Sequence, residues 1–220
     1  MSSRIKLRQA RMEDIPDILV VEEESWPEGL RATEEMFCAR IETFPEGVIV
    51  AENTDRIVGV VVGEIVNYDI NESYLPSWAE ITDNGYIRRS HNPTGDTLYG
   101  VDLSVSPLAS GGASKLLMLA MGKLVIRFNL KQGILGARMS RYCKYADRMT
   151  PWEYLMARTR SGRYIDPEIW FYSKLGLQIV RVIPNYIEDP ESCNNAVLLV
   201  WKNPFYGRPF PKLWSWLFRI

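Results

Sequence analysis

The chain is poor in the residues that many active sites require. Its 220 residues include one histidine and three cysteines. A metal site built from several histidines is therefore excluded, and a Ser-His-Asp triad would have to use His91, which lies in a polar stretch predicted to be a loop. Three widely spaced cysteines fit neither a disulfide framework nor a zinc site and are typical of a reducing compartment. We therefore predict no bound metal and a cytoplasmic location.

Long apolar runs and an excess of one charge are also lacking. No stretch approaches the roughly 18 consecutive apolar residues of a membrane span, and the first residues lack the apolar region of a secretory signal. Lys and Arg total 26 against 27 for Asp and Glu, so the chain as a whole does not favour nucleic acid. Neither a Walker A sequence nor G-x-G-x-x-G follows a predicted strand. The chemistry is left to Tyr, Asp, Glu, Arg or backbone amides.

What is present predicts one mixed α/β domain. The chain is 46% hydrophobic, enough to bury a core. Apolar alternation and β-branched runs predict strands at 5–10, 48–52, 57–62, 97–105, 134–139, 178–183 and 196–201. Caps and apolar stripes predict helices at about 12–26, 33–43, 113–128 and 166–175, with a further helix start at 150–153. The predicted order is β-α-α-β-β-β-α-β-α-β-β over residues 1–203, with a polar excursion at 67–96 and an aromatic, basic tail at 204–220.

The segment 97–128 predicts a strand, a turn of small residues and a helix. The first amides of a helix have no partner within it, and the helix dipole is positive there, so this start suits a phosphate or pyrophosphate. Ser110, Gly111, Gly112 and Ala113 would let a ligand approach the backbone closely, and Lys115 would add charge. A helix cap in a tight turn is the alternative interpretation.

Two single residues are candidates for proton transfer. Asp102 lies in an apolar strand, on one face with Gly100 and Ser104 if the strand alternates regularly. A carboxylate there is either a general base or the partner of a cation such as Arg138. Tyr172, near the end of a short predicted helix, could give its phenolic proton to a leaving group, although core packing is the usual role of such a tyrosine.

These segments in this order resemble the GNAT superfamily of CoA-dependent N-acetyltransferases, across residues 4–202. The family's Y-x-K-x-G-[FL] pattern is matched by residues 172–177 (Tyr-Ser-Lys-Leu-Gly-Leu). The resemblance implies that Tyr172 protonates the departing CoA thiolate and that an acyl-CoA, such as acetyl-CoA, is the donor. It also assigns donor binding to the fourth strand and to the following loop and helix start, as Leu103, Ser104, Val105, Ser110, Gly111, Gly112, Ala113 and Ser114.

A narrower resemblance rests on residues 25–27, 95–102, 144–147 and 184–186. These segments are similar to a GNAT subgroup found beside nitrilase-like hydrolases. That subgroup is related to GNAT-like domains that load polyketide synthases by decarboxylating malonyl thioesters. Trp26 is a candidate wall of the acceptor site, with burial in the core as the alternative, and Arg138 is a candidate substrate contact.

Two departures from the family pattern bear on the reaction. The pyrophosphate loop, usually [QR]-x-x-G-x-[GA], is about two residues short here, and Leu108 stands where Arg or Gln is usual. This favours keeping a carrier-protein pantetheine as an alternative donor. The decarboxylating branch relies on a Thr and a His, whose positions hold Arg138 and Tyr172, so the comparison favours acyl transfer over decarboxylation.

The leading hypothesis is therefore an enzyme that moves an acyl group to an amine of a small molecule or peptide, with Tyr172 as acid and Asp102 as candidate base. A malonyl decarboxylase or loading protein, and a binding module without catalysis, are the alternatives. The tail at 204–220 is interpreted first as a strap packed on its own domain or a partner, and second as a peripheral membrane contact.

Overall fold

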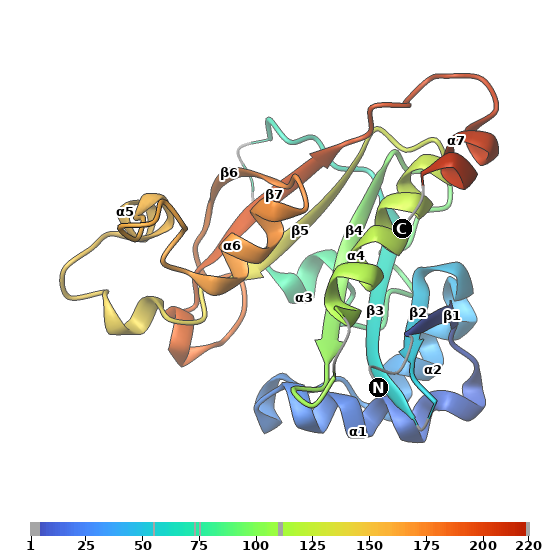
Figure 1. The fold of residues 1–220 in the computed structure, drawn as a ribbon, viewed down its shortest axis with the longest axis horizontal. Coiled ribbons are helices and arrows are strands. Elements are labelled where there is room, and N and C mark those ends of the chain that lie inside the picture. The colour runs from blue at the N-terminus through green and yellow to red at the C-terminus, as the bar shows by residue number, and fades with distance from the viewer. Residues whose placement is uncertain (1–4, 55, 73, 75, 110–111, 219–220) are drawn as a thin grey trace. The chain divides into compact units, whose positions relative to one another are not determined.

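The computed structural model describes residues 5–54, 56–72, 74, 76–109 and 112–218. They divide into two units (Figure 1). Unit 1 contains Met1–Asp69, Thr82–Gly133 and Lys202–Ile220, and unit 2 contains Ile70–Ile81 and Ile134–Trp201.

Unit 1 is built on four antiparallel strands. In chain order and in space they are β1 (Lys6–Gln9), β2 (Val48–Glu52), β3 (Ile57–Val66) and β4 (Thr97–Val105). Every residue of β3 is buried, as expected for a long β-branched strand between two neighbours. The register between β3 and β4 shifts at Val62/Gly63, where β4 contains one extra residue.

Helices cover both faces of these strands. They are α1 (Ile15–Ser25), α2 (Glu34–Thr43), α4 (Ala113–Arg127) and α7 (Pro211–Leu217). Helix α4 crosses β3 and β4 closely (Figure 1): a Cβ on Gly59 would lie 3.0 Å from Leu117, and one on Gly63 would lie 3.1 Å from Met121. Helix α1 contacts the same strands from the side of Ser104, which lies opposite Val60 and so faces away from Gly59 and Gly63.

Unit 2 contains β5 (Gln132–Arg138), β6 (Gln178–Ile183) and β7 (Ala196–Lys202), apart from the strand ends that fall in unit 1. Strand β7 lies between the other two and runs antiparallel to β6. The helices are α3 (Trp78–Ile81), α5 (Pro151–Met156) and α6 (Pro167–Lys174). Short 3-10 turns occupy Met12–Asp14, Glu28–Leu30 and Pro45–Gly47 in unit 1, and Tyr142–Lys144 and Pro190–Ser192 in unit 2.

Helix starts follow the predicted capping residues. The side chain of Thr33 accepts a hydrogen bond from the amide of Met36 at 3.3 Å and begins α2. Thr150 and Glu153 form a reciprocal capping box at the start of α5. Asp166 accepts from two amides of α6, at 2.9 and 3.0 Å. These local bonds satisfy amides that the helix itself cannot.

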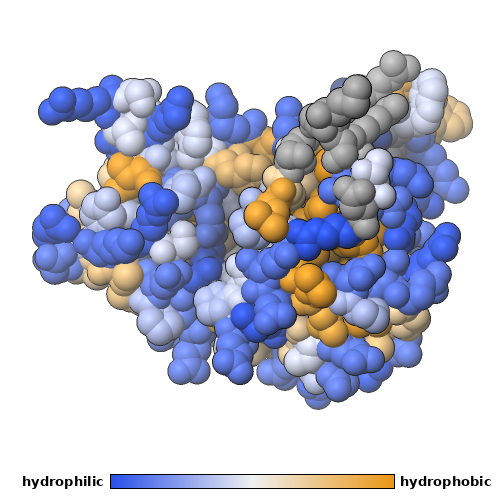
Figure 2. All heavy atoms as spheres, turned by 60° about the horizontal axis from the view of Figure 1, so that its bottom comes forward, coloured by the Kyte–Doolittle hydropathy of each residue, from blue (hydrophilic) through white to orange (hydrophobic). Residues whose placement is uncertain are grey.

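The mixed α/β class is confirmed, and each of the seven predicted strands is present. Helix α5 begins at the helix start predicted at 150–153, and α3 and α7 are added to the predicted elements. The excursion at 67–96 contains the four-residue α3 and is otherwise turn and loop in its described part. The tail at 204–220 contains α7, which packs against α4. In the part of the chain that is described, no helix has the length and apolar character to cross a membrane. Hydrophilic side chains cover most of the face seen in Figure 2.

Candidate active site

The bulge in β4 changes which of its residues share a face. Opposite residues of an antiparallel pair point the same way, and Val60, Val62 and Glu64 lie opposite Ser104, Asp102 and Tyr99. Regular alternation predicts Tyr99 on the other face from Asp102. That prediction is wrong, because the extra residue in β4 shifts the alternation by one. Tyr99, Asp102 and Ser104 therefore share the face that α1 covers, and Gly100, predicted to share it, lies on the other face.

Trp26 is tied to this face of β4. Its indole Nε1 donates to the Ser104 hydroxyl at 2.6 Å. The Ser104 hydroxyl in turn donates to Oδ1 of Asp102 at 3.1 Å. The structure thus brings together three of the residues that the sequence singles out. Ser104 is buried, and its single O–H proton faces two carboxyl groups, those of Asp102 and Glu22.

The cation beside Asp102 is Arg40 of α2, which the sequence analysis missed. Its Nη1 lies 3.1 Å from Oδ2 of Asp102, and its Nε donates to the carbonyl of Gly85 at 2.8 Å. The side chain of Arg40 is 0% exposed. Arg138, named from the sequence as a possible partner, instead pairs with Asp189 and Glu191 in unit 2.

Glu22 of α1 is a second missed residue. Its Oε2 accepts the amide of Ala32 at 2.9 Å, while its buried Oε1 has no hydrogen-bond partner among the described residues. Burial, reinforced by the negative charge of Asp102, raises the pKa of Glu22 to about 8, although the Ser104 hydroxyl opposes this shift. A signal for Glu22 exists in the sequence, because it follows Ile15 and Ile18 by seven and four positions, on the buried face of the helix.

Glu64 places another carboxyl inside unit 1. Its Oε2 accepts from the Ser90 hydroxyl at 2.6 Å, and Oε1 is buried without a hydrogen-bond partner in the described chain. Burial raises the pKa of Glu64 to about 8, and the charge of Arg40 opposes the shift. The sequence gives a weak signal here, one carboxyl in an otherwise apolar strand.

Glu22, Asp102 and Glu64 therefore act electrostatically around one guanidinium, that of Arg40. Three ionised carboxylates would exceed the one positive charge in a buried setting, so protonation of Glu22 and Glu64 near neutral pH relieves the excess. Such a cluster can store and accept a proton, the property expected near a base-catalysed reaction. Among the described residues, no group of three or more side chains is arranged to hold a metal ion.

The start of α4 is the predicted anion site. Gly112, the N-cap residue, adopts a left-handed conformation with φ of 76° and has no side chain to cap the helix. Ala113 is buried and Ser114 half-buried. Ser110 and Gly111 lie outside the described residues. Leu108, where the family usually has Arg or Gln, is exposed.

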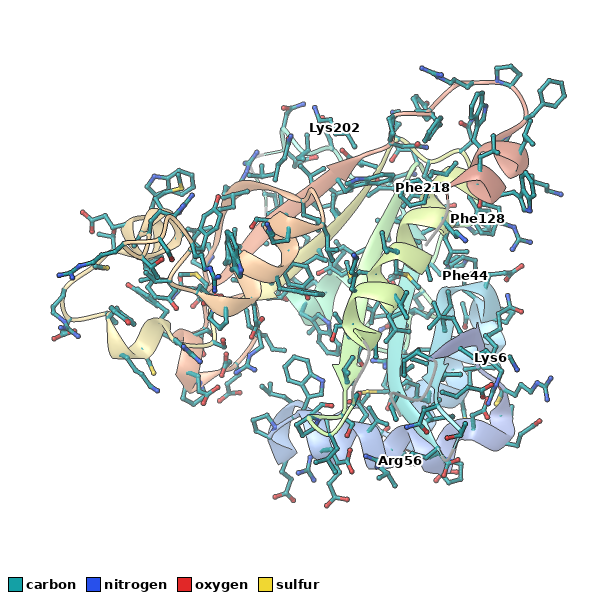
Figure 3. The ribbon with its side chains drawn as sticks, in the orientation of Figure 1. Lys6, Phe44, Arg56, Phe128, Lys202 and Phe218 are labelled. Carbon is teal, nitrogen blue, oxygen red and sulfur yellow. The ribbon has the colours of Figure 1, made fainter. Side chains whose placement is uncertain are left out.

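His91 has a structural role. Its Nδ1 accepts the amide of Ile65 at 3.1 Å, and its ring stacks on Phe44 at 4.5 Å. Phe44 in turn meets Phe128 edge-on, at 5.7 Å between ring centres (Figure 3). Burial lowers the pKa of His91, which keeps the ring neutral and able to accept at Nδ1.

Tyr172 and Arg138, the remaining candidates, belong to unit 2. Tyr172 lies in the last turns of α6, half-buried, with its ring edge-on to Phe171 at 5.2 Å. The helix ends as predicted at Gly176, which has φ of 85°. Arg138 makes a two-pronged ion pair with Asp189, at 2.9 and 3.0 Å. The charge of Arg138 also acts on Glu168 of α6. Burial, with the negative charge of Asp166, raises the pKa of Glu168 to about 7.

No family model matches the chain. A Bacillus subtilis (strain 168) protein named "Uncharacterized N-acetyltransferase YkwB" is 37% identical over 209 residues, which are 93% of this chain and 91% of that protein. "Probable hydrolase YhcX" from the same organism is 33% identical over 205 residues. The matched part is 92% of this chain but 39% of that hydrolase, so the chain spans less than half of this second relative.

Solved structures agree in fold. The loading GNATL domain of CurA from Lyngbya majuscula has a TM-score of 0.79 at 22% identity, covering 91% of this chain and 98% of that one. The GphF GNAT-like decarboxylase, solved in complex with isobutyryl-CoA, has a TM-score of 0.75 at 22% identity, covering 90% and 99%. With the relative identical at more than a third of positions over nearly its whole length, the chain belongs to the GNAT family of N-acetyltransferases.

Proposed function

We propose that this protein transfers an acyl group from a pantetheine thioester to an amine, and that the buried carboxylates beside β4 receive the amine proton. The observation that carries the proposal is the pairing of Asp102 with Ser104 and Arg40, in a cluster with more carboxylates than cations. The family relationship supplies the class of reaction. The acceptor is a small molecule or peptide that presents a neutral amine.

On the donor side, pantetheine lies along the backbone of Leu103, Ser104 and Val105. The diphosphate of CoA meets the amides of residues 112–114, at the start of the 15-residue helix α4. The glycine N-cap has no side chain of its own to occupy these amides, and the helix dipole favours a negative group there. Ser110 and Gly111 complete the proposed donor site. A carrier-protein pantetheine is the alternative donor.

In the transfer step, the amine nitrogen attacks the thioester carbonyl and forms a tetrahedral intermediate. Asp102 takes a proton from that nitrogen. Collapse of the intermediate breaks the C–S bond, and Tyr172 protonates the thiolate as it leaves. Ser104 and Arg40 each bind one carboxylate oxygen of Asp102, and these bonds fix the orientation of the carboxylate that takes the proton. Trp26, held by Ser104, forms part of the acceptor wall, and Arg138 contacts the substrate as a further proposed site residue.

A second candidate function is decarboxylation of a malonyl thioester. It is favoured by the fold similarity to GphF, described as a GNAT-like decarboxylase, and to the CurA loading domain. The residues argue for transfer, because Arg138 and Tyr172 occupy the positions where the decarboxylating branch is expected to have Thr and His. Release of carbon dioxide from malonyl-CoA, measured without an added amine, distinguishes the two reactions.

The first test is a calorimetric titration of the purified protein with acetyl-CoA. Saturable binding with one site per chain supports the CoA donor and leads to an amine screen that follows thiol release. If CoA thioesters do not bind, acylated carrier proteins are titrated next. Failure of both donors would overturn the proposal.

With a donor and acceptor in hand, Tyr172→Phe tests the acid. The variant should bind donor as the wild type does and turn over about 10²-fold to 10⁴-fold more slowly, the usual contribution of a positioned acid. Tyr164→Phe, in the same unit, is the matched control and should keep its rate. Full turnover in Tyr172→Phe would remove the tyrosine from the mechanism.

A further inference from the structure

The tail of the chain carries an exposed apolar helix face that the acyl-transfer site does not use. The exposed fractions are 73% for Phe210, 49% for Leu213, 67% for Trp216 and 48% for Leu217. In α7, Leu213, Trp216 and Leu217 are spaced three and four positions apart, so they lie on one side of the helix. Phe210 adds to this side from the N-cap position. We call these four residues the tail face.

The opposite side of α7 holds the helix in place. The Ser215 hydroxyl donates to the carbonyl of Lys123 in α4 at 3.2 Å. The ring of Phe218 lies beside α4 (Figure 3), and a Cβ on Gly122 would be 3.6 Å from it. Trp214 stacks on Phe205 with 5.2 Å between ring centres. This side of the tail therefore packs on its own unit as a strap, while the tail face points away from these contacts.

The tail and the helix α4 that it packs on are basic. Neither residues 113–133 nor residues 203–220 contain Asp or Glu, although the whole chain has a net charge of −1. Lys212 lies four positions before Trp216, and Arg208 lies near the rings of Phe205 and Trp214, at 5.7 Å from each. In the described part of the chain, no ion pair with a carboxylate is found for these basic residues: Lys123, Arg127, Lys202, Arg208 and Lys212.

This combination selects one kind of partner. Exposed aromatic and leucine side chains beside unpaired basic groups are the features of a helix that lies in the headgroup layer of an anionic bilayer. A symmetric contact between two copies of the chain would bring the same basic groups together and repel. We propose that α7 docks the protein onto the surface of an anionic phospholipid membrane, with Trp216, Phe210 and Leu213 inserted between headgroups.

The direct test is co-sedimentation of the full chain with vesicles of phosphatidylcholine, with and without phosphatidylserine. We expect the protein to pellet with the serine-containing vesicles, to stay in solution with pure phosphatidylcholine, and to be released by salt. Phe210→Ser combined with Trp216→Ser should abolish pelleting. Trp152→Ser, which removes an exposed tryptophan of unit 2, should leave it unchanged.

Lys212→Glu tests the charge without touching the apolar face. Each basic group near an anionic surface contributes about fivefold to partitioning, so this reversal should weaken binding by at least that factor. Circular dichroism and thermal melts of each variant establish that it is folded.

Three results would overturn the proposal. The first is no pelleting of the wild type with anionic vesicles at low salt. The second is equal pelleting of the wild type and the folded Phe210→Ser, Trp216→Ser variant. The third is a dimer in sedimentation velocity that this variant converts to monomer, which would assign the tail face to a second copy of the chain.

Discussion

Arg40 and Asp102 form a buried ion pair, with 3.1 Å between Nη1 and Oδ2, that links α2 to β4 across 62 positions of sequence. The guanidinium also binds the carbonyl of Gly85, so one side chain joins a helix, a strand and a loop. Its Nη2 is buried without a hydrogen-bond partner among the described residues. A charge in this position is retained at a cost, which is typical of a group kept for function.

Replacing Arg40 by leucine should destabilise the protein strongly. The change leaves Asp102 and its carboxylate neighbours without their cation, and breaking a buried pair in this way costs about 3–5 kcal/mol. The measurement is the free energy of unfolding in urea. Arg88→Leu is the control, since it breaks an exposed pair with Glu42 worth about 0–1 kcal/mol. Equal losses in the two variants would show that the Arg40 pair is not a structural centre of unit 1.

Stability should fall as the pH rises from about 4.5 to about 8. The pKa values of Glu22 and Glu64 are each raised from 4.5 to about 8 in the folded protein. Between pH 4.5 and pH 8 the folded state binds more protons than the unfolded state. The stabilisation that the two glutamates provide is therefore complete below pH 4.5 and is lost as the pH rises through about 8. The slope is at most about 1.4 kcal/mol per pH unit for each proton.

Urea unfolding at a series of pH values measures this slope directly. Glu64→Gln keeps the shape and removes one titrating group, so its profile should be flatter than that of the wild type. Glu35→Gln, at an exposed position of α2, should leave the slope unchanged. A wild-type profile that is level between about pH 5 and pH 9 would contradict the raised pKa values.

Much of the fold could be predicted because its signals are local. Thr33, Thr150 and Asp166 cap their helices through side chains within three residues of the amides they bind. The β-branched runs give the strands, and Gly176 ends α6 where a left-handed residue is needed. Such features depend on neighbouring residues, which the sequence displays directly.

The candidate site could be predicted only in part, because its contacts are distant in sequence. Asp102, Ser104 and Trp26 were identified individually, but no spacing indicates that Arg40 is the cation beside Asp102. The bulge after Gly100 cannot be seen in the alternation of β4, so regular alternation puts Tyr99 on the wrong face. Glu22 is the exception, since its spacing from Ile18 places it on a buried face.

Gly136→Ala should destabilise unit 2. A Cβ at this position of β5 would collide with the ring of Tyr186, which is itself buried. Forcing a methyl group into such packing costs about 1–3 kcal/mol. Gly29→Ala is the control, because no atom of the described residues lies within 4 Å of a Cβ placed there. Unfolding measurements should also show that adding Tyr186→Leu to Gly136→Ala costs less than the sum of the single changes, since the collision partner is gone. Additive losses would contradict this packing.

The indole group of Trp26 should report the ionisation of Glu22. Its Nε1–H donates to Ser104 at 2.6 Å, and the Ser104 hydroxyl also interacts with the carboxyl of Glu22. As Glu22 loses its proton, the hydroxyl is polarised differently and the hydrogen bond from the indole changes strength. In ¹⁵N-labelled protein, the Trp26 indole resonance should therefore shift with pH, with a midpoint of about 8.

Two variants test whether the shift of the Trp26 indole resonance comes from Glu22. Trp26→Phe assigns the resonance by removing it, and Glu22→Gln should leave the resonance in place while abolishing the shift near pH 8. The exposed indole of Trp152, in unit 2, serves as the internal reference and should not follow the same titration. If the shift persists in Glu22→Gln, another group titrates beside Ser104. In that case the proton store next to Asp102 has to be assigned to a residue other than Glu22, because Ser104 is the contact through which Glu22 reaches both Trp26 and Asp102.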